Sequence, residues 1–227
     1  MKTWRFLICI NLTLILFGSS LQGQQNSPEE KQFVETRAKA ETGDALAQVF
    51  LGYYYLNGLG VTKSEVEAVN WYRKAADQNF AYGQYNLGSC YEHGQGVTKD
   101  MGEAVKWYRK AADQNLAEAQ FNLGNCYKHG DGVAKNLVEA VKWCHKAAEQ
   151  NFANAQFNLG IWYFRGEGVT QDAAEGYKWF ILSAEQGFEP AKQALNKLKA
   201  AESPSDQKQI SEGKNRANSW TKQHKKP

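Results

Sequence analysis

The chain has 227 residues and a formal net charge of +3 at pH 7, from 27 Lys and Arg side chains against 24 Asp and Glu. Lys2 and Arg5 lie in an N-terminal segment that we expect to be removed, which leaves 27 − 2 = 25 basic side chains against 24 acidic ones. A nearly neutral protein attracts phosphate backbones only weakly. We therefore expect no nucleic acid among its partners.

The N-terminus predicts a secretory signal peptide over residues 1–23. Lys2 and Arg5 precede an apolar run over residues 6–17, and small residues follow at positions 18–20. The run is shorter than the roughly 20 residues that a transmembrane helix needs. We expect cleavage after Ser20 or Gly23 and a secreted or periplasmic protein, with an uncleaved N-terminal anchor as the alternative. No later segment is apolar enough to span a bilayer, so we expect no membrane association after cleavage.

Residues 45–188 repeat themselves at intervals of 36 residues. The motif Asn-Leu-Gly begins at residues 86, 122 and 158, and Glu-Ala-Val begins at residues 67, 103 and 139. A period of this size is typical of a solenoid, in which each unit buries its apolar face only against its neighbours. We predict an all-α solenoid with full repeats at residues 45–80, 81–116, 117–152 and 153–188.

Each repeat is predicted to contain two helices. In the second repeat the apolar spacing indicates a first helix over residues 81–93, ended by Gly94, since glycine adopts a left-handed conformation without a Cβ clash. An N-cap residue then begins the second helix, and a glutamate three residues later predicts a capping box. These pairs are Ser64 and Glu67, Asp100 and Glu103, Asn136 and Glu139, and Asp172 and Glu175. The second helices are expected to end at Asn79, Asn115, Asn151 and Gly187.

Half-repeats are predicted at both ends, so that the solenoid covers residues 28–201. Residues 30–42 resemble a lone second helix, and residues 189–201 resemble a lone first helix. Residues 202–227 are predicted to form a C-terminal capping helix and a polar tail, beginning at Ser203 and Pro204. Its apolar stripe is expected to cover the open end of the array, because solenoids need caps for solubility; the stripe consists of Ile210, Gly213, Ala217 and Trp220. We expect the residues after Trp220 to fray.

Three cysteines remain after removal of the signal segment, Cys90, Cys126 and Cys144. The number is odd, so at least one thiol is free or pairs between molecules. Cys90 and Cys126 occupy equivalent positions in adjacent repeats, which stack at about 8–10 Å, beyond the reach of a disulfide. Cys126 and Cys144 are the only realistic pair within one chain, and packed free thiols are the alternative.

The residues of the repeat resemble the Sel-one-like repeat family, a branch of the tetratricopeptide superfamily. In the second repeat the family motif is met by Ala81, Leu87, Gly88, Tyr91, Gly94, Gly96, Val97, Asp100, Ala104, Trp107, Tyr108, Lys110, Ala111 and Ala112. The departures are Ser64 in the first repeat, Cys144 in the third, and Gly176, Phe180 and Ser183 in the fourth.

This resemblance implies a right-handed superhelix of helix pairs that serves as a scaffold for protein complexes. A cysteine-rich branch of the family is associated with penicillin binding. The cysteines of that branch fall at the positions of Ala76 and Gln84 here, so its disulfide pattern is absent.

A helical wheel leaves one side of each first helix without a packing role in its own repeat, and in tetratricopeptide-like stacks this side lines the concave groove. It carries aromatic residues and a recurrent asparagine, whose amide suits a peptide backbone. The predicted groove residues are Tyr82, Tyr85, Asn86, Ser89, Phe121, Asn122, Asn125, Lys128, Phe157, Asn158 and Arg165. The alternative is that the aromatic residues pack between neighbouring first helices and bind no ligand.

Catalytic and metal-binding patterns are incomplete. The Cys-x-x-His pairs that begin at Cys90 and Cys126 do not supply four converging zinc ligands. The Ser-x-x-Lys matches at Ser205 and Ser211 lack the companion elements of penicillin-recognising enzymes. Interior packing is expected for the tryptophans at positions 71, 107, 143 and 179.

We therefore predict no catalytic activity, no cofactor and no metal. The protein is expected to be an exported, monomeric scaffold or adaptor that binds a peptide or protein on its concave face. The alternative is a cell-envelope protein that binds or hydrolyses β-lactams, like the cysteine-rich branch.

Overall fold

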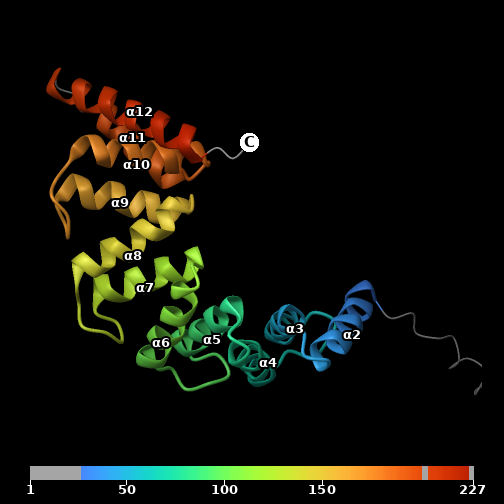
Figure 1. The fold of residues 1–227 in the computed structure, drawn as a ribbon. Helices are drawn as coiled ribbons and strands as arrows, with labels where there is room; N and C mark the ends of the chain where they lie inside the picture. Colours follow the sequence, from blue (N-terminus) through green and yellow to red (C-terminus); the bar gives the residue numbers. More distant parts are fainter. Residues whose placement is uncertain (1–26, 201–203, 225–227) are drawn as a thin grey trace, which may run out of the picture.

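The computed structural model describes residues 27–200 and 204–224, and every regular element in those residues is a helix. The helices stack in a curved array, with α2 and α12 at opposite ends (Figure 1). The predicted all-α solenoid is confirmed. The helix bounds are α2 Pro28–Glu41, α3 Ala45–Asn57, α4 Glu65–Asp77, α5 Ala81–His93, α6 Met101–Asp113, α7 Ala117–His129, α8 Leu137–Glu149, α9 Ala153–Arg165, α10 Ala173–Glu185, α11 Glu189–Ala200 and α12 Pro204–His224. The first helices of the four full repeats are α3, α5, α7 and α9, and α4, α6, α8 and α10 are the second helices.

The predicted helix ends are confirmed by the backbone. Gly94 ends α5 with φ of 72°, and Asn79, Asn115 and Asn151 have φ of 59°, 66° and 64°. The second glycine of the loop has a role beyond turning the chain. Gly96 has φ of +68°, and a Cβ there would overlap the carbonyl oxygen of Glu65, at the start of α4. Each loop thus rests on the second helix of the preceding repeat, which only glycine allows.

The N-caps are confirmed, but the capping boxes predicted for the four second helices are wrong. The N-cap side chains accept the backbone N–H three residues later, as Asp100 does from Glu103 at 3.0 Å. The backbone N–H of the N-cap, which the glutamate would have to accept, donates instead to a carbonyl of the first helix; for Asp100 this is Tyr91 O at 2.9 Å. Glu103 pairs with Lys106 instead, at 2.6 Å. Both bonds of a capping box form at the start of α2, between Ser27 and Glu30.

Buried amides join each repeat to the next. Gln120 of α7 is 1% exposed, and its Nε2 donates to Ala112 O and to Asn115 Oδ1 at the end of α6. Its Oε1 accepts from Gln150 Nε2 at 2.8 Å, just after α8. Gln48, Gln84 and Gln156 accept the equivalent bond at 2.7 Å, from Gln78, Gln114 and Gln186. The amide clusters satisfy buried polar groups that would otherwise destabilise the stack.

The helix α12, where the sequence predicts a cap, packs across α10 (Figure 1). Ile210, Ala217 and Trp220 are 6%, 2% and 9% exposed. Trp220 Nε1 donates to Glu149 Oε2 of α8 at 2.9 Å. The fraying expected directly after Trp220 is wrong, because α12 continues to His224. The His224 ring stacks on Trp220 at 4.0 Å, and its Nε2 lies 3.2 Å from Glu149.

Cys90, Cys126 and Cys144 are all buried free thiols, so the structure contains no bond between Cys126 and Cys144. Burial raises the pKa of Cys90 to about 11 and that of Cys126 to about 12, so both thiols stay protonated at neutral pH. Within the described residues, no helix is both long and apolar enough to cross a membrane. The predicted signal peptide and the N-cap at Ser203 lie outside the described residues.

Candidate protein-binding face

The first helices present equivalent positions at intervals of 36 residues, and together these form what we call the first-helix face. Its outer positions are Leu46, Phe50 and Tyr53 on α3, Tyr82, Asn86 and Ser89 on α5, Glu118, Asn122 and Asn125 on α7, and Asn154, Asn158 and Ile161 on α9. Its inner positions are Val49, Tyr85, Phe121 and Phe157.

The inner positions pack more than the helical wheel predicts. The Tyr85 ring lies 5.8 Å from that of Tyr108 in its own repeat, and Phe157 lies 5.5 Å from both Phe180 and Phe188. Phe121 lies 5.3 Å from Phe152. The expectation that this side has no packing role in its own repeat is therefore wrong for the inner positions. The inner positions lie at the boundary between the outward-facing side and the core-facing side of each first helix, close enough to contact the second helix of the same repeat.

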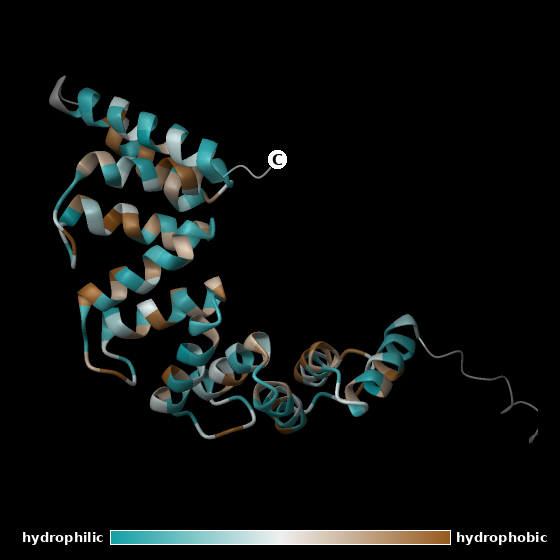
Figure 2. Cartoon of the chain, in the orientation of Figure 1, coloured by the Kyte–Doolittle hydropathy of each residue, from teal (hydrophilic) through white to brown (hydrophobic). Residues whose placement is uncertain are grey.

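The outer positions at the N-terminal end remain exposed. Leu46, Phe50 and Tyr53 of α3 are 51%, 49% and 49% exposed, and Tyr82 of α5 is 48% exposed. α3 contacts α5 directly and contains no charged residue. Figure 2 shows α3 in mostly hydrophobic colours, whereas α12 is largely hydrophilic. This end of the face is therefore apolar and uncharged.

The recurrent asparagines have different surroundings. Asn86 Nδ2 donates to the carbonyl of Tyr82 in its own helix at 2.8 Å. The Asn122 side chain acts to lower the pKa of both Tyr85 and Tyr108. Burial raises the pKa of Tyr85, and burial together with a hydrogen bond to Glu92 raises that of Tyr108. In the described part of the chain, Asn125 and Asn158 show no side-chain hydrogen bond, so these amides are available to a ligand.

The remaining predicted residues surround the face with polar and cationic groups. The Ser89 hydroxyl lies 3.5 Å from His93 Nδ1. The Lys128 ammonium lies 5.7 Å from the centre of the Trp162 ring, and Arg165 lies 3.4 Å from Glu167. Lys128 and Arg165 belong to α7 and α9, so the cations gather toward the C-terminal end of the face.

The tryptophan row lies on the second helices and is mostly enclosed. Trp71 and Trp143 are 9% and 8% exposed, and Trp179 is fully buried. Lysine ammonium groups cover the ring faces, as Lys74 does over Trp71 at 3.6 Å from the ring centre. The expected interior packing is confirmed for these three rings, whereas Trp107 is only half-buried and lines a surface pocket.

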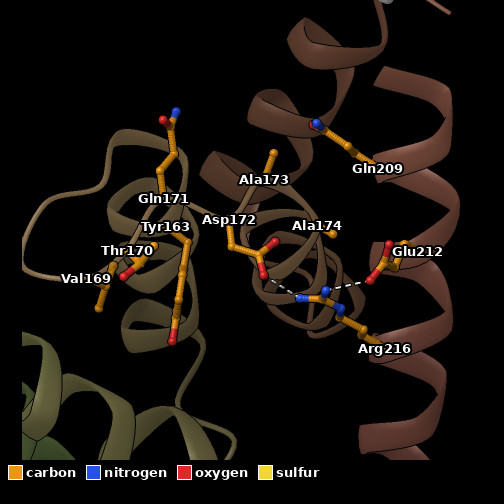
Figure 3. A pocket seen from close by; sticks show the side chains of 10 residues that line it. All are labelled: Tyr163, Val169, Thr170, Gln171, Asp172, Ala173, Ala174, Gln209, Glu212 and Arg216. Atoms are coloured by element: carbon orange, nitrogen blue, oxygen red, sulfur yellow. Dashed lines mark hydrogen bonds and ion pairs between the residues drawn. The ribbon is translucent and has the colours of Figure 1, made fainter. Parts of the chain in front are cut away.

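A pocket of about 650 Å³ lies where the loop before α10 meets α12, and its lining residues are those labelled in Figure 3. Arg216 of α12 reaches Asp172 at 2.8 Å, Glu212 at 2.5 Å and Glu175 at 3.2 Å. Burial acts to raise the pKa of Asp172, but hydrogen bonds from Arg216 and from the backbone of Glu175 lower it overall. Arg216 therefore holds α12 in place and is not free to bind an anion.

Stacked helix pairs with one open side define the class of helical-repeat proteins. The sequence profile described as Sel1 repeat matches residues 45–80, 81–116, 117–152 and 153–188, more than half of the chain. The chain belongs to the Sel1 repeat family, whose members are generally non-catalytic scaffolds for protein–protein interactions.

Solved structures agree with this assignment. The chain is similar to a protective antigen of uropathogenic Escherichia coli with an SLR fold (43% identity, TM-score 0.67), covering 68% of this chain and 33% of the antigen. It is also similar to a Sel1 repeat protein from Oxalobacter formigenes (39% identity, TM-score 0.66), covering 69% of this chain and 64% of that one. An immunity protein from Pseudomonas aeruginosa (21% identity, TM-score 0.54; 91% and 78% covered) shares the fold. No curated protein sequence matches the chain significantly.

The chain thus spans about a third of the antigen and under two thirds of the Oxalobacter protein. Sequence reasoning missed Leu46 and the exposure of Phe50. The signal was present, because aligning the repeats places Leu46 with Tyr82, and Phe50 with Asn86, 36 residues on.

Proposed function

We propose that this chain is an exported, non-catalytic adaptor that binds a segment of another protein on its first-helix face. The observation that carries the proposal is the exposed apolar group of Leu46, Phe50, Tyr53 and Tyr82 on two contacting first helices. Exposed apolar side chains gathered on adjacent elements mark interaction sites. The scaffold role that is general in the Sel1 repeat family supports the same conclusion.

The bound segment runs from this apolar group along the stack toward α9. Asn125 and Asn158 lie along that path with unused amides, which can both donate to and accept from a peptide backbone. Lys128 and Arg165 add positive charge further along. Tyr85, Phe121 and Phe157 support the face from below, since their rings are partly committed to the repeat core. The protein acts as a monomer and does not bind nucleic acid.

The experiment first identifies the partner and then measures its affinity. Crosslinking and affinity capture with the chain lacking residues 1–23, followed by mass spectrometry, supply the partner. The variant Phe50→Ala/Tyr53→Ala/Tyr82→Ala is then compared with the parent by calorimetry. We expect at least about a tenfold loss of affinity, because each central aromatic contact contributes on the order of 1 kcal/mol or more.

The matched control is Val66→Ala/Val138→Ala, which removes two exposed apolar side chains from second helices. The control variant should bind like the parent. A folded triple variant with unchanged affinity would remove the N-terminal apolar group from the site. The pair Phe121→Ala/Asn122→Ala tests the middle of the face in the same way, with circular dichroism to check folding.

Export is tested by the mass of the protein recovered from culture medium and from cell envelopes. A chain shortened by 20 or 23 residues supports signal cleavage at Ser20 or Gly23. A full-length chain in the membrane fraction supports the uncleaved anchor instead, and a full-length chain in the cytosol contradicts export.

A further inference from the structure

A second apolar surface lies at the C-terminal end of the first-helix face. A pocket of about 290 Å³ opens between α9 and α11, over α10. Ile161 of α9 and Lys197 of α11 line it, and they occupy the same position of successive first helices, 36 residues apart. The pocket therefore continues the surface to which we assign protein binding.

The floor of the pocket is built by departures from the repeat motif. Phe164 and Phe180 stack with their rings 5.4 Å apart and 19° from parallel. Phe164 stands where the two preceding repeats have Glu92 and Lys128. Gly176 replaces the alanine that recurs at positions 68, 104 and 140, and a Cβ at position 176 would lie 2.5 Å from the Phe164 ring. The fourth repeat thus exchanges a charged residue for a stacked aromatic floor.

The walls and rim of the pocket determine which ligand it suits. Ala194 stands where the three preceding first helices carry Asn86, Asn122 and Asn158, and the short side chain leaves the floor accessible. Arg165 and Lys197 stand at the rim. The Arg165 side chain is 66% exposed, with Glu167 at 3.4 Å, and Lys197 is exposed and forms no ion pair within the described residues. An apolar floor beside two cations is complementary to an apolar group that carries a carboxylate.

We propose that this pocket holds the C-terminal residue of the bound protein segment, with its side chain on the Phe164–Phe180 floor and its carboxylate between Arg165 and Lys197. The proposal rests on the proposed function. α11 is the last helix in the first-helix position, because α12 packs across α10 instead of continuing the row. The face therefore ends at this pocket, and the positive charge there favours the carboxyl end of a bound chain.

The test uses two peptide pools, each with eight randomised residues followed by leucine. One pool has a free C-terminal carboxylate and the other a C-terminal amide. Immobilised protein is exposed to both, and the retained peptides are quantified by mass spectrometry. We expect the free-acid pool to be retained about tenfold more, the ratio that corresponds to one charge-assisted contact. Arg165→Gln/Lys197→Gln should bring the ratio to about one.

Lys106→Gln/Lys142→Gln is the matched control, since it removes two exposed lysines from second helices. It should keep the parental ratio. Ala194→Phe fills the pocket without changing its charge and should also abolish the preference. Equal retention of the two pools by the parent, retention of neither, or an unchanged ratio in Arg165→Gln/Lys197→Gln overturns the proposal. In one such outcome the parent protein retains the two pools equally while Phe50→Ala/Tyr53→Ala/Tyr82→Ala retains neither. That result rejects only the terminal pocket, and the proposed function stands.

Discussion

The two ends of the array are built from the same repeat, but their apolar side chains differ in exposure to solvent. At the N-terminal end, α3 and α5 leave Phe50, Tyr53 and Tyr82 about half exposed. At the C-terminal end, α12 covers α10, so that Trp179, Leu182 and Trp220 are enclosed. The difference does not come from the motif that defines the repeat. The difference in exposure comes from the residues that lie between the motif positions and from the additional helix α12.

Ion pairs follow the same division. α12 is held against the array by Arg216, which pairs with Asp172 and Glu175, and by Trp220 and His224, which contact Glu149. α3 has no charged residue. The comparison indicates that α12 closes the array on the second-helix side of its C-terminal end, whereas the first helices of the N-terminal end are left open for a partner.

The largest effect on stability is expected from Trp220→Ala, which removes the side chain that anchors α12 at the C-terminal end of the array. Loss of a buried tryptophan generally costs about 3–5 kcal/mol of unfolding free energy. Hydrogen exchange should show α10 and α12 opening while α3 and α5 keep their protection, because solenoid repeats contact only their neighbours. Ser219→Ala, on the exposed side of α12, is the control and should change little. Equal loss of protection in α3 would show that the two ends do not behave independently.

A smaller effect is expected from Gln120→Leu, in the middle of the array. The substitution leaves Asn115 and Gln150 without their buried partner, at a cost of about 1–3 kcal/mol. Urea denaturation measures the change. Gln150→Leu at the exposed end of the same cluster should cost less. A Gln120→Leu variant as stable as the parent would show that the amide clusters do not stabilise the stack.

The smallest effect is a pH dependence of stability, confined to the C-terminal end of the array where α12 packs on α10. Burial lowers the pKa of His145 below its ordinary value of 6.5, and Lys178 also lowers it, while Glu149 and Glu175 act in the opposite direction. The folded state therefore binds this proton less readily than the unfolded state, and stability is lost as the pH falls below about 6.5. His145→Gln should reduce the change in hydrogen exchange of α8 and α10 between pH 7.5 and 5.5, whereas exposed His93→Gln should not. A parental pH response in His145→Gln contradicts this assignment.

Local signals made much of the fold predictable. The N-caps Asp100 and Asn136 and the left-handed Asn79 and Asn115 depend on a few neighbouring residues, and all formed as expected. The capping boxes failed because the backbone N–H of the N-cap bonds to a first-helix carbonyl such as Tyr91 O. That bond depends on how the two helices pack, which sequence spacing does not contain.

The candidate site was less predictable for the same reason. A helical wheel separates the sides of an isolated helix, but it does not show how much of that helix the second helix of the repeat covers. Tyr85 and Phe157 therefore pack against aromatic rings of the second helices, although the wheel predicts that their side chains are free. The hydrogen bond of the buried Gln84 was not predicted either, because its partner Gln114 lies 30 residues away. The stripe on α12 was visible in the sequence, but its anchors to Glu149 and Asp172 depend on docking across the array.

The amide clusters also set how long the array can grow. The glutamine position that recurs at 48, 84, 120 and 156 falls on Lys192 in α11, whose ammonium pairs with Glu189 at 2.7 Å. Gly187 likewise replaces the asparagine that completes the clusters after α4, α6 and α8. A duplicated 36-residue unit placed inside the array would meet matching partners on both sides, whereas one appended after α10 would lack the asparagine partner at position 187. Whole units are therefore accommodated better inside the array than at its C-terminal end.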